Sequence, residues 1–436
     1  MVPVNAADHE RKPGMYFIDP PKEVMHIIDV LMQHGYEAYA VGGCIRDSVM
    51  GRQPKDWDIT TSAYPDVVKG LFEKTLDTGL RHGTVTVMMD GGSYEVTTFR
   101  IDGRYEDGRH PEYVEFTGRL EDDLRRRDFT INSMAWNAEC GIIDPFGGIR
   151  DIAAKVVRAV GTPSERFRED ALRMLRAVRF AASLGFGIEE STFDAIKNNC
   201  ALIRKISAER IREELTGILT SDDPGKFALL AETGLLEQIL GKFGYSFTNA
   251  GNVSAIGAVE ADVCLRWTML LRCLTISEAN EAAKDILFKL KFSNKNMDRI
   301  LRLLKYVDML ILPEPGDVAK AVSAAGEDIF PDLLKLKRAA ALTLTHDEKI
   351  GSNCHDSIDE IEKIYRELLA SGRCLKLKDL AVNGQDLMRL GFREGIDIGN
   401  ALSYLLDRVI KEPELNRKDI LERMALDYSK ERLPGE

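Results

Sequence analysis

The pattern of hydrophobic and polar positions divides the chain into two parts of different character. From about residue 22 to 150, short segments with strand patterns alternate with brief helical segments and glycine turns. From about residue 150 onward, long stretches with helical periodicity follow one another almost without interruption. The sequence therefore predicts an α+β fold in which an α/β lobe comes first and an all-α region follows.

Within the first lobe, four segments have patterns that define their structure. Residues 36–41 form a short apolar run typical of a buried strand, and residues 44–50 are long enough to open a helix. Residues 83–89 and 93–100 alternate in polarity and are joined by Asp90-Gly91-Gly92, which predicts a β-hairpin.

Two further segments break the periodicity. Residues 101–111, with the sequence IDGRYEDGRHP, combine glycines and charges without an apolar period, which predicts a mobile loop near the hairpin. Residues 144–148, with the sequence DPFGG, interrupt the pattern just before the helical region begins. We expect a hinge between two domains at this point.

Size and composition narrow the class of protein. A chain of 436 residues exceeds the usual single-domain size, so two to four domains are expected. The shares of hydrophobic (44%) and charged (30%) residues are ordinary, and no apolar run is long enough to cross a bilayer. The net charge of -11 excludes a surface coated in positive charge, so contact with nucleic acid would need a local groove.

The cysteines and the first residues indicate the compartment. Seven cysteines are dispersed, odd in number and without a Cys-x-x-Cys pair, which argues against a disulfide framework and a zinc site. The first 20 residues have no apolar stretch like that of a signal peptide. We therefore expect a cytoplasmic protein that does not enter a membrane.

A pair of aspartates provides the first candidate for chemistry. Asp56 and Asp58 are one residue apart on a predicted strand, so their side chains point to one face while Trp57 and Ile59 enter the core. Mg²⁺ prefers one or two carboxylates together with substrate phosphates, and two such ions activate an attacking hydroxyl and stabilise a leaving oxygen. An isolated Asp-x-Asp is often only a pair of solvated acids, so the surrounding residues must decide.

The residues just upstream favour a phosphate site. The predicted strand leads to Gly42 and Gly43, which let backbone amides approach a ligand without a Cβ in the way. The N-terminus of the following helix favours an anion, and Arg46 adds a cationic donor fork. A phosphate clamp beside a metal pair is the predicted arrangement.

A run of three arginines precedes Asp128, which is placed to cap a helix, and Asn132 follows one turn later. In isolation, a solvated surface charge run is the simpler interpretation. With a metal pair in the same domain, an arginine here becomes a candidate ligand for triphosphate or ribose oxygens.

A second charged group opens the helical half. At 100° per residue, Asp170, Arg173 and Arg176 fall within an arc of about 120° on one helix, whereas Arg179 has rotated about 180° from Asp170. Three apolar residues form a parallel row: Leu172, Leu175 and Val178. An amphipathic helix with ordinary ion pairs is the simpler interpretation.

The same residues also fit a role in recognising a base. Cytosine and adenine present an amino donor beside a ring-nitrogen acceptor, whereas uracil and guanine present a carbonyl acceptor beside a ring N–H. An aspartate acceptor next to an arginine donor matches the first two and opposes the others, and unpaired polar groups in a buried pocket are costly. Asp170 and Arg173 are therefore candidates to select a nucleotide without a template.

Together these motifs resemble the class II nucleotidyltransferases, the family that includes bacterial tRNA CCA-adding enzymes and poly(A) polymerases. The resemblance runs from about residue 36 to 214 through the ordered motifs GGCIRD, DWDIT, RRDFTIN, DPFGGIRD, EDALRMLRAVR and ISAERIREE. A weaker likeness covers residues 380–399, which are similar to the tail of Firmicutes-type members.

The resemblance implies roles for individual residues. Asp56 and Asp58 would bind two Mg²⁺, and Glu95 would be the third catalytic carboxylate. Asp170 and Arg173 would read the base edge. The full set of implied nucleotide-binding residues is Gly43, Arg46, Arg127, Asp170, Arg173, Arg176 and Arg179.

The resemblance also implies an architecture. The family has a seahorse-like shape with a catalytic nucleotidyltransferase head that contains a small mixed β-sheet, followed by an all-α neck, body and tail. In this chain the head would cover residues 22–150, the base-recognising neck 151–245, the body 246–370 and the tail 371–436. Body and tail would hold the acceptor and TΨC arms of tRNA, by shape and phosphate contacts.

The activity implied is template-independent addition of C, C and A to the tRNA 3′ end from CTP and ATP, with release of pyrophosphate. The segment at residues 101–111 resembles a loop required for A addition, which disfavours a CC-only enzyme. An enzyme that adds only A has similar motifs and stays open as an alternative, followed by a poly(A) polymerase. A catalytically inactive tRNA-binding protein is the alternative from a different class, and the oligomeric state stays open.

Overall fold

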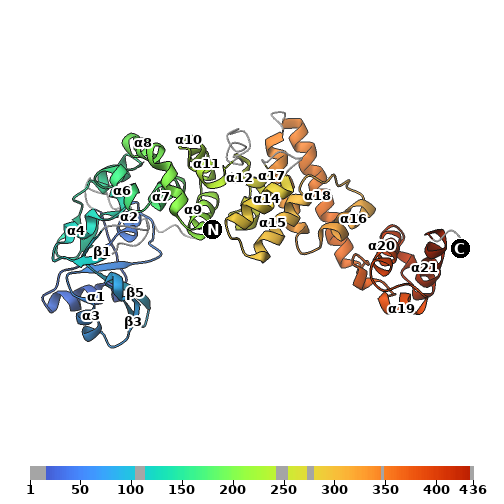
Figure 1. Cartoon of the computed structure of the whole chain (residues 1–436), viewed down its shortest axis with the longest axis horizontal. Helices are drawn as coiled ribbons and strands as arrows, with labels where there is room; N and C mark the ends of the chain where they lie inside the picture. Colours follow the sequence, from blue (N-terminus) through green and yellow to red (C-terminus); the bar gives the residue numbers. More distant parts are fainter. Residues whose placement is uncertain (1–15, 104–112, 242–253, 273–278, 345–347, 433–436) are drawn as a thin grey trace, which may run out of the picture. The chain divides into compact units, whose positions relative to one another are not determined.

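The computed structural model describes residues 16–103, 113–241, 254–272, 279–344 and 348–432. The chain divides into two compact units, Met1–Thr248 and Asn249–Glu436. In Figure 1 the first unit runs from blue to green and the second from yellow to red. All described strands belong to the first unit, so the predicted order of an α/β lobe followed by helices is confirmed.

A seven-stranded sheet forms the centre of the first unit. Its strand order is β3-β4-β5-β2-β1-β8-β9, and β2 pairs with β5 in parallel while the other neighbouring strands are antiparallel. The strands are β1 (Ala38–Val41), β2 (Asp58–Thr61), β3 (Thr75–Gly79), β4 (Thr84–Met89), β5 (Gly92–Thr98), β8 (Ala135–Asn137) and β9 (Gly141–Ile143). The predicted small mixed sheet is therefore present.

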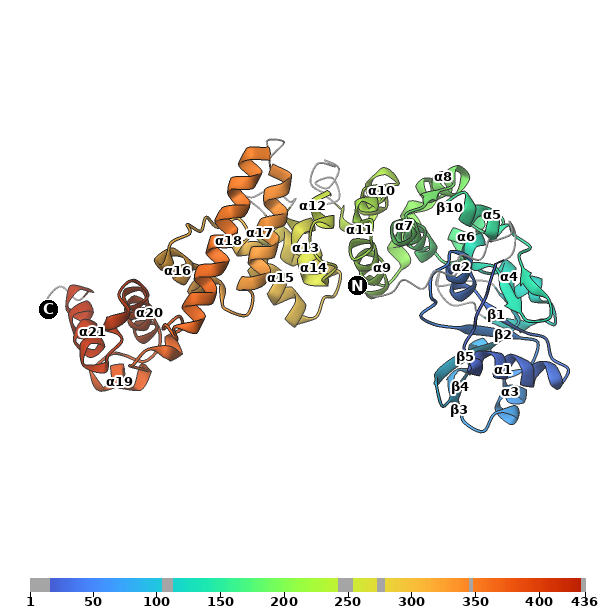
Figure 2. The same ribbon diagram turned by 180° about the vertical axis from the view of Figure 1, so that it is seen from behind.

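One face of this sheet is covered by α1 (Lys22–Gln33) and α3 (Pro65–Leu71), which appear beside β5 in both views (Figures 1 and 2). Alternate strand residues such as Val85 and Val96 enter the core beneath these helices. Because successive side chains of a strand point to opposite faces, Glu95 lies on the face away from α1 and α3. Its partner in the antiparallel pair is Thr86 of β4. The core therefore fixes which face carries the acid.

The locally predicted elements of this lobe are confirmed. The strand β1 is buried at all four positions and leads directly into α2 (Gly43–Val49). The hairpin of β4 and β5 turns at the glycine pair. The predicted loop at residues 101–111 begins later than expected, because Ile101 and Asp102 belong to β6 (Arg100–Asp102), which pairs with β7 (Val114–Phe116). Residues 104–111 of the prediction lie outside the described residues.

Helices continue the first unit beyond the sheet. They are α4 (Leu120–Arg125), α5 (Gly148–Ala153), α6 (Pro163–Glu169), α7 (Leu172–Leu184), α8 (Glu190–Asn199), α9 (Ala208–Leu219), α10 (Ala228–Glu232) and α11 (Leu235–Leu240), with short 3₁₀ turns that include η2 (Thr130–Asn132). The predicted all-α neck also contains a two-residue parallel strand pair, β10 (Val156–Val157) and β11 (Gly187–Ile188). The predicted apolar row of α7 is buried against its neighbours: Leu172, Leu175 and Val178.

The second unit is helical throughout the residues that the structure describes. Its helices are α12 (Ser254–Gly257), α13 (Val263–Leu271), α14 (Ala279–Lys289), α15 (Asn294–Tyr306), α16 (Pro315–Ala325), α17 (Phe330–Leu344), α18 (Glu348–Ala370), α19 (Gly384–Arg389), α20 (Ile396–Lys411) and α21 (Lys418–Arg432). The long helices α17 and α18 lie side by side in both views (Figures 1 and 2). None of the described helices has the length and apolar character needed to span a membrane.

Candidate functional site

Three acidic side chains line one cavity beside the central strands β2 and β5. Asp58 is the first residue of β2 and Asp56 precedes the strand, and both are exposed while Trp57 and Ile59 are buried, as the alternation predicts. In the parallel pair, Ile59 of β2 lies opposite Val96 of β5. The preceding residues, Asp58 and Glu95, therefore occupy adjacent positions on neighbouring strands.

A cavity of about 620 Å³ connects these three carboxylates. It is lined by residues 53–58 and 91–95, with Asp19 and Pro21 at the start of α1. Within the part of the chain that the structure describes, Asp56, Asp58 and Glu95 form no ion pair and no side-chain hydrogen bond. The three acids thus face a solvent-filled space with their oxygens uncommitted.

The electrostatics of the acids follow from this crowding. Partial burial raises the pKa of Asp58, while Arg127 lowers it and Asp56 raises it further. Partial burial and the neighbouring charge of Asp58 raise the pKa of Glu95. A carboxylate pKa rises when like charges share a site, so these groups repel one another until a cation neutralises them.

The donor set fits a hard divalent cation. Mg²⁺ takes oxygen ligands, usually one or two carboxylates plus waters and substrate phosphates, and the acids at this cavity supply only oxygen. No group of three His, Cys, Asp or Glu side chains among the described residues is close enough to hold a metal as it stands. An ion here would therefore complete its shell with water or phosphate, as Mg²⁺ commonly does.

The predicted phosphate site is assembled beside the acids. Gly42 has a φ of +87°, and a Cβ there would lie 3.0 Å from Nη1 of Arg127. A Cβ at Gly43 would lie 3.6 Å from Nη2 of Arg46, so this guanidinium lies over the first turn of α2. The fold therefore brings Gly43, Arg46 and Arg127 together, although Gly43 and Arg127 are 84 positions apart in the sequence.

A chain of hydrogen bonds leads from this cluster to the neck. Arg46 donates through Nη1 to Oδ1 of Asn132 at 2.7 Å, and the Asn132 amide donates to Oδ1 of Asp128 at 3.1 Å. Arg176 on α7 donates through Nε to Oδ2 of Asp128 at 2.8 Å. Asp128 was expected to cap a helix, but the 3₁₀ turn η2 takes Phe129 as its cap residue, and Asp128 joins Arg46 to the neck instead.

The helical-wheel prediction for Asp170 is wrong. The helix α6 ends at Glu169 and α7 begins at Leu172, so Asp170 belongs to neither helix and cannot share a helix face with Arg173 and Arg176. The physical reason is a local hydrogen bond, in which Oδ1 of Asp170 accepts from the backbone N–H of Leu172 at 2.9 Å. Aspartate side chains commonly compete with the helix in this way at its start.

The proposed base-reading residues have partners within the chain. Oδ2 of Asp170 accepts from Arg210 of α9 at 2.9 Å. Arg173 is 8% exposed, forms an ion pair with Glu169 at 2.5 Å and donates to the backbone carbonyl of Arg126 at 3.0 Å. The neck thus holds Asp170 and Arg173 in one region, and each of them has a partner within the chain.

Arg179 is placed differently from the residues before it. Its Nε donates to Oε2 of Glu214 at 2.6 Å, and its guanidinium lies 4.7 Å from the ring centre of Phe180. Glu214 lies on α9 one turn beyond Arg210, the partner of Asp170, so α9 supplies a partner to both Arg179 and Asp170. These two ion pairs, Arg179 with Glu214 and Asp170 with Arg210, tie α7 and the residue before it to α9.

Sequence reasoning missed the acids that hold these arginines. Asp123 is fully buried and pairs with Arg126 at 2.8 Å and Arg127 at 3.3 Å. Glu169 holds Arg173 and also forms an ion pair with Arg166. Spacing of three or four residues on a helix was the available signal for both acids.

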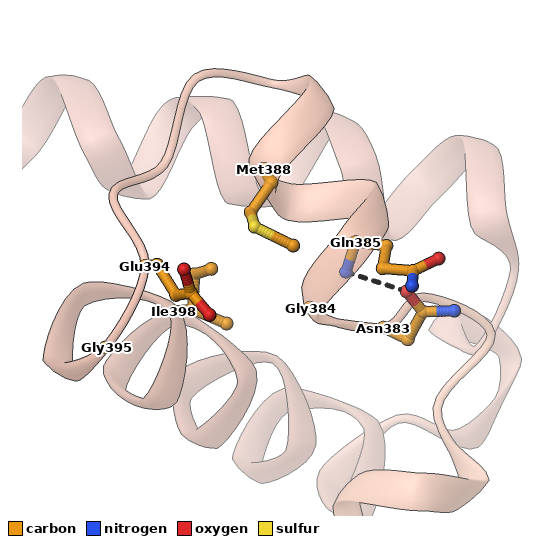
Figure 3. Close-up of a pocket in the computed structure, with 7 residues that line it drawn as sticks. All are labelled: Asn383, Gly384, Gln385, Met388, Glu394, Gly395 and Ile398. Carbon is orange, nitrogen blue, oxygen red and sulfur yellow. Dashed lines mark hydrogen bonds between the residues drawn. The ribbon is translucent and has the colours of Figure 1, made fainter.

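A second cavity, of about 510 Å³, lies in the second unit where the segment before α19 meets the start of α20 (Figure 3). The side chain of Asn383 points to the backbone of Gln385 and accepts its N–H at 2.9 Å. Glu394 is the only charged side chain among the described residues that line it. A lone acid does not favour a phosphate, so this cavity adds no support for a predicted tRNA contact in the tail.

Comparison with known families covers most of the chain. The sequence pattern described as the poly A polymerase head domain matches residues 38–158, which contain the sheet and all three acids. A probable RNA- and SrmB-binding site of polymerase A matches residues 185–243, and a putative tRNA nucleotidyltransferase domain 2 matches residues 262–425.

Individual relatives are similar over nearly their whole length. The CCA-adding enzyme of Geobacillus kaustophilus is 39% identical over 410 residues, which are 92% of this chain and 95% of that protein. The CCA-adding enzyme of Lactobacillus helveticus is 34% identical over 93% of this chain and 96% of its own. The crystal structure of the Bacillus stearothermophilus CCA-adding enzyme in complex with CTP superposes with a TM-score of 0.76 at 34% identity, covering 95% of this chain and 99% of that one.

A more distant structure has the same fold. The Thermotoga maritima CCA-adding enzyme complexed with tRNA has a TM-score of 0.62 at 19% identity and covers 94% of this chain and 97% of its own. The head pattern and the paired acids define the class, a nucleotidyltransferase of the poly(A) polymerase type. Within that class, the chain belongs to the family of CCA-adding enzymes, which are tRNA nucleotidyltransferases that generally use divalent metal ions.

Proposed function

We propose that this protein adds C, C and A to the 3′ end of tRNA, taking CTP and ATP as substrates and releasing pyrophosphate. The observation that carries the proposal is the meeting of three uncommitted carboxylates, Asp56, Asp58 and Glu95, beside the guanidinium groups of Arg46 and Arg127. Carboxylates that bind divalent cations and arginines that bind phosphates together make a site for a nucleoside triphosphate.

The chemical step is an in-line displacement at the α-phosphate. The 3′-hydroxyl oxygen of the RNA forms a bond to the α-phosphorus, and the bond from that phosphorus to the bridging oxygen breaks, so that pyrophosphate leaves. Mg²⁺ bound by Asp56 and Asp58 would activate the hydroxyl and neutralise the charge on the leaving oxygen. Glu95, beside Asp58 on the neighbouring strand, would be the third carboxylate of this site.

Positioning by the chain accounts for the rest of the mechanism. Arg46 and Arg127 would orient the triphosphate, and the 3₁₀ turn that carries Asn132 supports Arg46 through its hydrogen bond. Asp170 accepts from the amino group of C or A, and Arg173 donates to the adjacent ring nitrogen. Arg176 and Arg179 support this pocket from the next turns of α7. A wrong base would leave buried polar groups unpaired, which is the source of selectivity.

Replacement of the metal-binding acids tests the proposal. We expect Asp56→Asn and Asp58→Asn each to lower nucleotide incorporation by more than about a thousandfold, or about 4 kcal/mol of transition-state stabilisation. Both residues are exposed, so the fold and the affinity for tRNA should stay close to those of the unmodified protein. Incorporation at the normal rate by either variant would contradict the assignment of the acids.

Labelled nucleotides distinguish the competing activities. The full chain is incubated with tRNAs that end at the discriminator base, at C and at CC, with CTP or ATP in turn. Addition of C, C and then A supports the proposal, whereas A added only to the tRNA ending in CC identifies an A-adding enzyme. Runs of A on unrelated RNA identify a poly(A) polymerase, and binding without incorporation identifies an inactive tRNA-binding protein. Loss of incorporation in EDTA, with recovery in Mg²⁺, tests the choice of ion.

The proposed domain organisation and compartment have separate support. The division between the two compact units, after Thr248, falls close to the proposed boundary between neck and body at residues 245 and 246. Head and neck would therefore form the first unit, and body and tail, which would hold the acceptor and TΨC arms, the second. The described cysteines at 44, 140, 200, 264 and 374 are free thiols, which supports a reducing cytoplasm.

A further inference from the structure

The aromatic ring of Phe180 lies among three arginines of the proposed nucleotide site. The guanidinium carbon lies 5.3 Å from the centre of this ring in Arg46, 5.3 Å in Arg176 and 4.7 Å in Arg179. A cation within about 6 Å of the centre of an aromatic ring is attracted by the negative charge density of the ring face. Phe180 is therefore a common neighbour of three cations that would act on the nucleotide.

The three arginines come from two different elements. Arg46 stands on α2, beside the proposed triphosphate site, whereas Arg176 and Arg179 stand on α7, the helix that carries Arg173. Arg46 and Phe180 are 134 positions apart, so they meet only because the neck packs on the sheet. The ring thus joins the element that would orient the triphosphate to the helix that would recognise the base.

The core fixes the position of the ring. Phe180 is 8% exposed, and its ring packs edge to face against the fully buried ring of Phe129, with the two centres 5.7 Å apart. Phe129 directly follows Asp128, the partner of Arg176. The side chain of Arg46 is only 11% exposed. Because a cation–π contact strengthens when ring and cation are shielded from water, the contact with Arg46 is well placed to be effective.

The ring orients the arginines without adding a negative charge. Each arginine also has a carboxylate partner in an ion pair: Arg46 with Asp47, Arg176 with Asp128, and Arg179 with Glu214. A carboxylate orients a guanidinium but also repels an incoming phosphate, whereas a neutral ring does not. Three cations at one ring repel one another, and a bound triphosphate with its several negative charges would relieve this repulsion.

We propose that Phe180 is a positioning residue for nucleotide binding. Its ring holds Arg46 of α2 at a fixed place relative to Arg176 and Arg179 of α7, so that the triphosphate and the base are bound at a fixed separation. The ring acts through the arginines and contacts none of the reacting atoms. This inference rests on the proposed nucleotidyl transfer and adds a residue without polar side-chain atoms to its nucleotide site.

Fluorinated phenylalanines in place of Phe180 test the contribution of the ring face. Each fluorine atom withdraws electrons from the ring and weakens its attraction for cations, while the shape of the side chain changes little. We expect the dissociation constant of CTP, measured by equilibrium dialysis with the full chain, to rise stepwise with one, two and three fluorine atoms, by about tenfold in total. ATP should show the same trend, because the triphosphate is common to both nucleotides. A dissociation constant that stays constant across the series would overturn the proposal.

The matched control is the same series at Phe167. This phenylalanine also lies in the first unit, on α6, and is fully buried, but no cation lies over its ring among the residues that the structure describes. Fluorination there should leave the dissociation constant of CTP within about twofold of that of the unmodified protein. An equal rise at Phe167 would show that fluorine acts through packing and would overturn the role of the cations.

Phe180→Leu, which keeps an apolar side chain but removes the ring, is the second variant. We expect it to weaken the binding of CTP and of tripolyphosphate, which has no base, by about tenfold each, and to change the affinity for tRNA by less than about twofold. Equal binding of CTP by Phe180→Leu and the unmodified protein would overturn the proposal.

Measuring binding instead of incorporation separates this inference from the proposed reaction. A chain that binds CTP with the expected fluorine trend but transfers no nucleotide would refute the proposed function and support the role of Phe180. A chain that adds C, C and A but shows no trend would do the reverse. A chain that binds no CTP at all would overturn both.

Discussion

At the scale of single residues, charged groups in the first unit differ in how far they are already engaged. The arginines and the aspartate proposed to contact the nucleotide have partners within the chain, as the pairs Asp170–Arg210 and Arg176–Asp128 show. The carboxylates at the cavity have none among the described residues. A bound nucleotide must therefore replace contacts that the arginines and Asp170 already make within the chain. Cations, in contrast, meet carboxylate oxygens that have no partner among the described residues.

Arg210 is expected to position Asp170. One of its nitrogens donates to Oδ2 of Asp170, and another is buried without a hydrogen-bond partner in the described residues. In Arg210→Gln we expect the preference for CTP over UTP to fall about tenfold, equivalent to about 1.4 kcal/mol, because Asp170 is then free to turn away from the base edge. Competition between the two labelled nucleotides measures this ratio.

The control for this prediction is Arg204→Gln, which removes the same charge from an exposed position in the same unit. Its preference for CTP should be unchanged. A purely structural role of Arg210 would reduce the rates with both nucleotides equally, and an unchanged ratio would therefore contradict positioning. Arg210→Lys should recover part of the selectivity, because it restores the cation but not the planar fork.

Asp128 links pH to the stability of the first unit. Burial would raise its pKa, but Arg176 and the hydrogen bond from Asn132 outweigh burial and hold the pKa at about 2. An unfolded aspartate has a pKa of about 3.9, so the ionised pair contributes its full stability above about pH 4 and loses it as the pH falls toward 2. The contribution is about 2 kcal/mol at pH 7.

We therefore expect Asp128→Asn to lose at least about 2 kcal/mol at pH 7 and to approach the stability of the unmodified protein near pH 2. Of the three tryptophans, Trp57 and Trp136 lie in the first unit and Trp267 in the second. Urea unfolding followed by fluorescence in a Trp267→Phe background thus reports on the first unit alone. A difference that stays constant with pH would show that the Asp128 charge is not responsible. Glu121→Gln, at a 44% exposed side chain, should show no such difference.

At the scale of elements, the passage from β1 into α2 shapes the phosphate site. We expect Gly42→Ala to raise the KM for CTP about tenfold, because its Cβ would press on Arg127 at 3.0 Å. The backbone φ of +87° adds strain of about 1–3 kcal/mol for a residue with a Cβ. Nucleotide titrations and thermal unfolding measure the two effects separately.

Gly51→Ala is the matched control at the other end of α2. Gly51 also has a positive φ, +72°, but a Cβ there meets nothing within 4 Å. It should therefore lose stability by about 1 kcal/mol and leave the KM for CTP unchanged. A similar KM increase in both variants would mean that strain, and not the contact with Arg127, causes the effect.

Elements with a strong local pattern could be predicted from the sequence. The buried strand before Gly42, the hairpin at Gly91 and Gly92 and the alternation around Trp57 depend on neighbours within a few residues, and all were correct. The interruption at Asp170 was missed because one side-chain hydrogen bond there competes with the helix. The pair of Arg176 and Asp128, 48 positions apart, depends on how the neck packs on the sheet, which no local pattern encodes.

At the scale of the whole molecule, the cavity with the three carboxylates and the proposed nucleotide-binding residues belong to the first unit. Each unit has internal packing of its own, so residues 1–248 are expected to fold when produced alone. We expect this fragment to bind CTP within about threefold of the full chain and to bind tRNA at least about tenfold more weakly, because the fragment lacks the phosphate contacts proposed for the second unit. Fluorescence anisotropy at one fixed salt concentration measures both affinities.

The full chain at the same salt is the reference for that comparison. Equal tRNA affinity of fragment and full chain would remove the second unit from tRNA binding. Weak CTP binding by the fragment would instead show that the nucleotide site needs residues beyond 248. Circular dichroism establishes that the fragment is folded before either affinity is compared.

The crowding of Asp58 and Glu95 has a thermodynamic consequence. Partial burial and, for Glu95, the charge of Asp58 raise the pKa values of both carboxyls, so protons compete with an arriving cation at a higher pH than they would at free carboxylates. Isothermal calorimetry of Mg²⁺ uptake at a series of pH values should give heats that vary with the ionisation enthalpy of the buffer, and this variation should decrease as the pH rises. The acidity of the medium thus affects how readily the catalyst is loaded with metal.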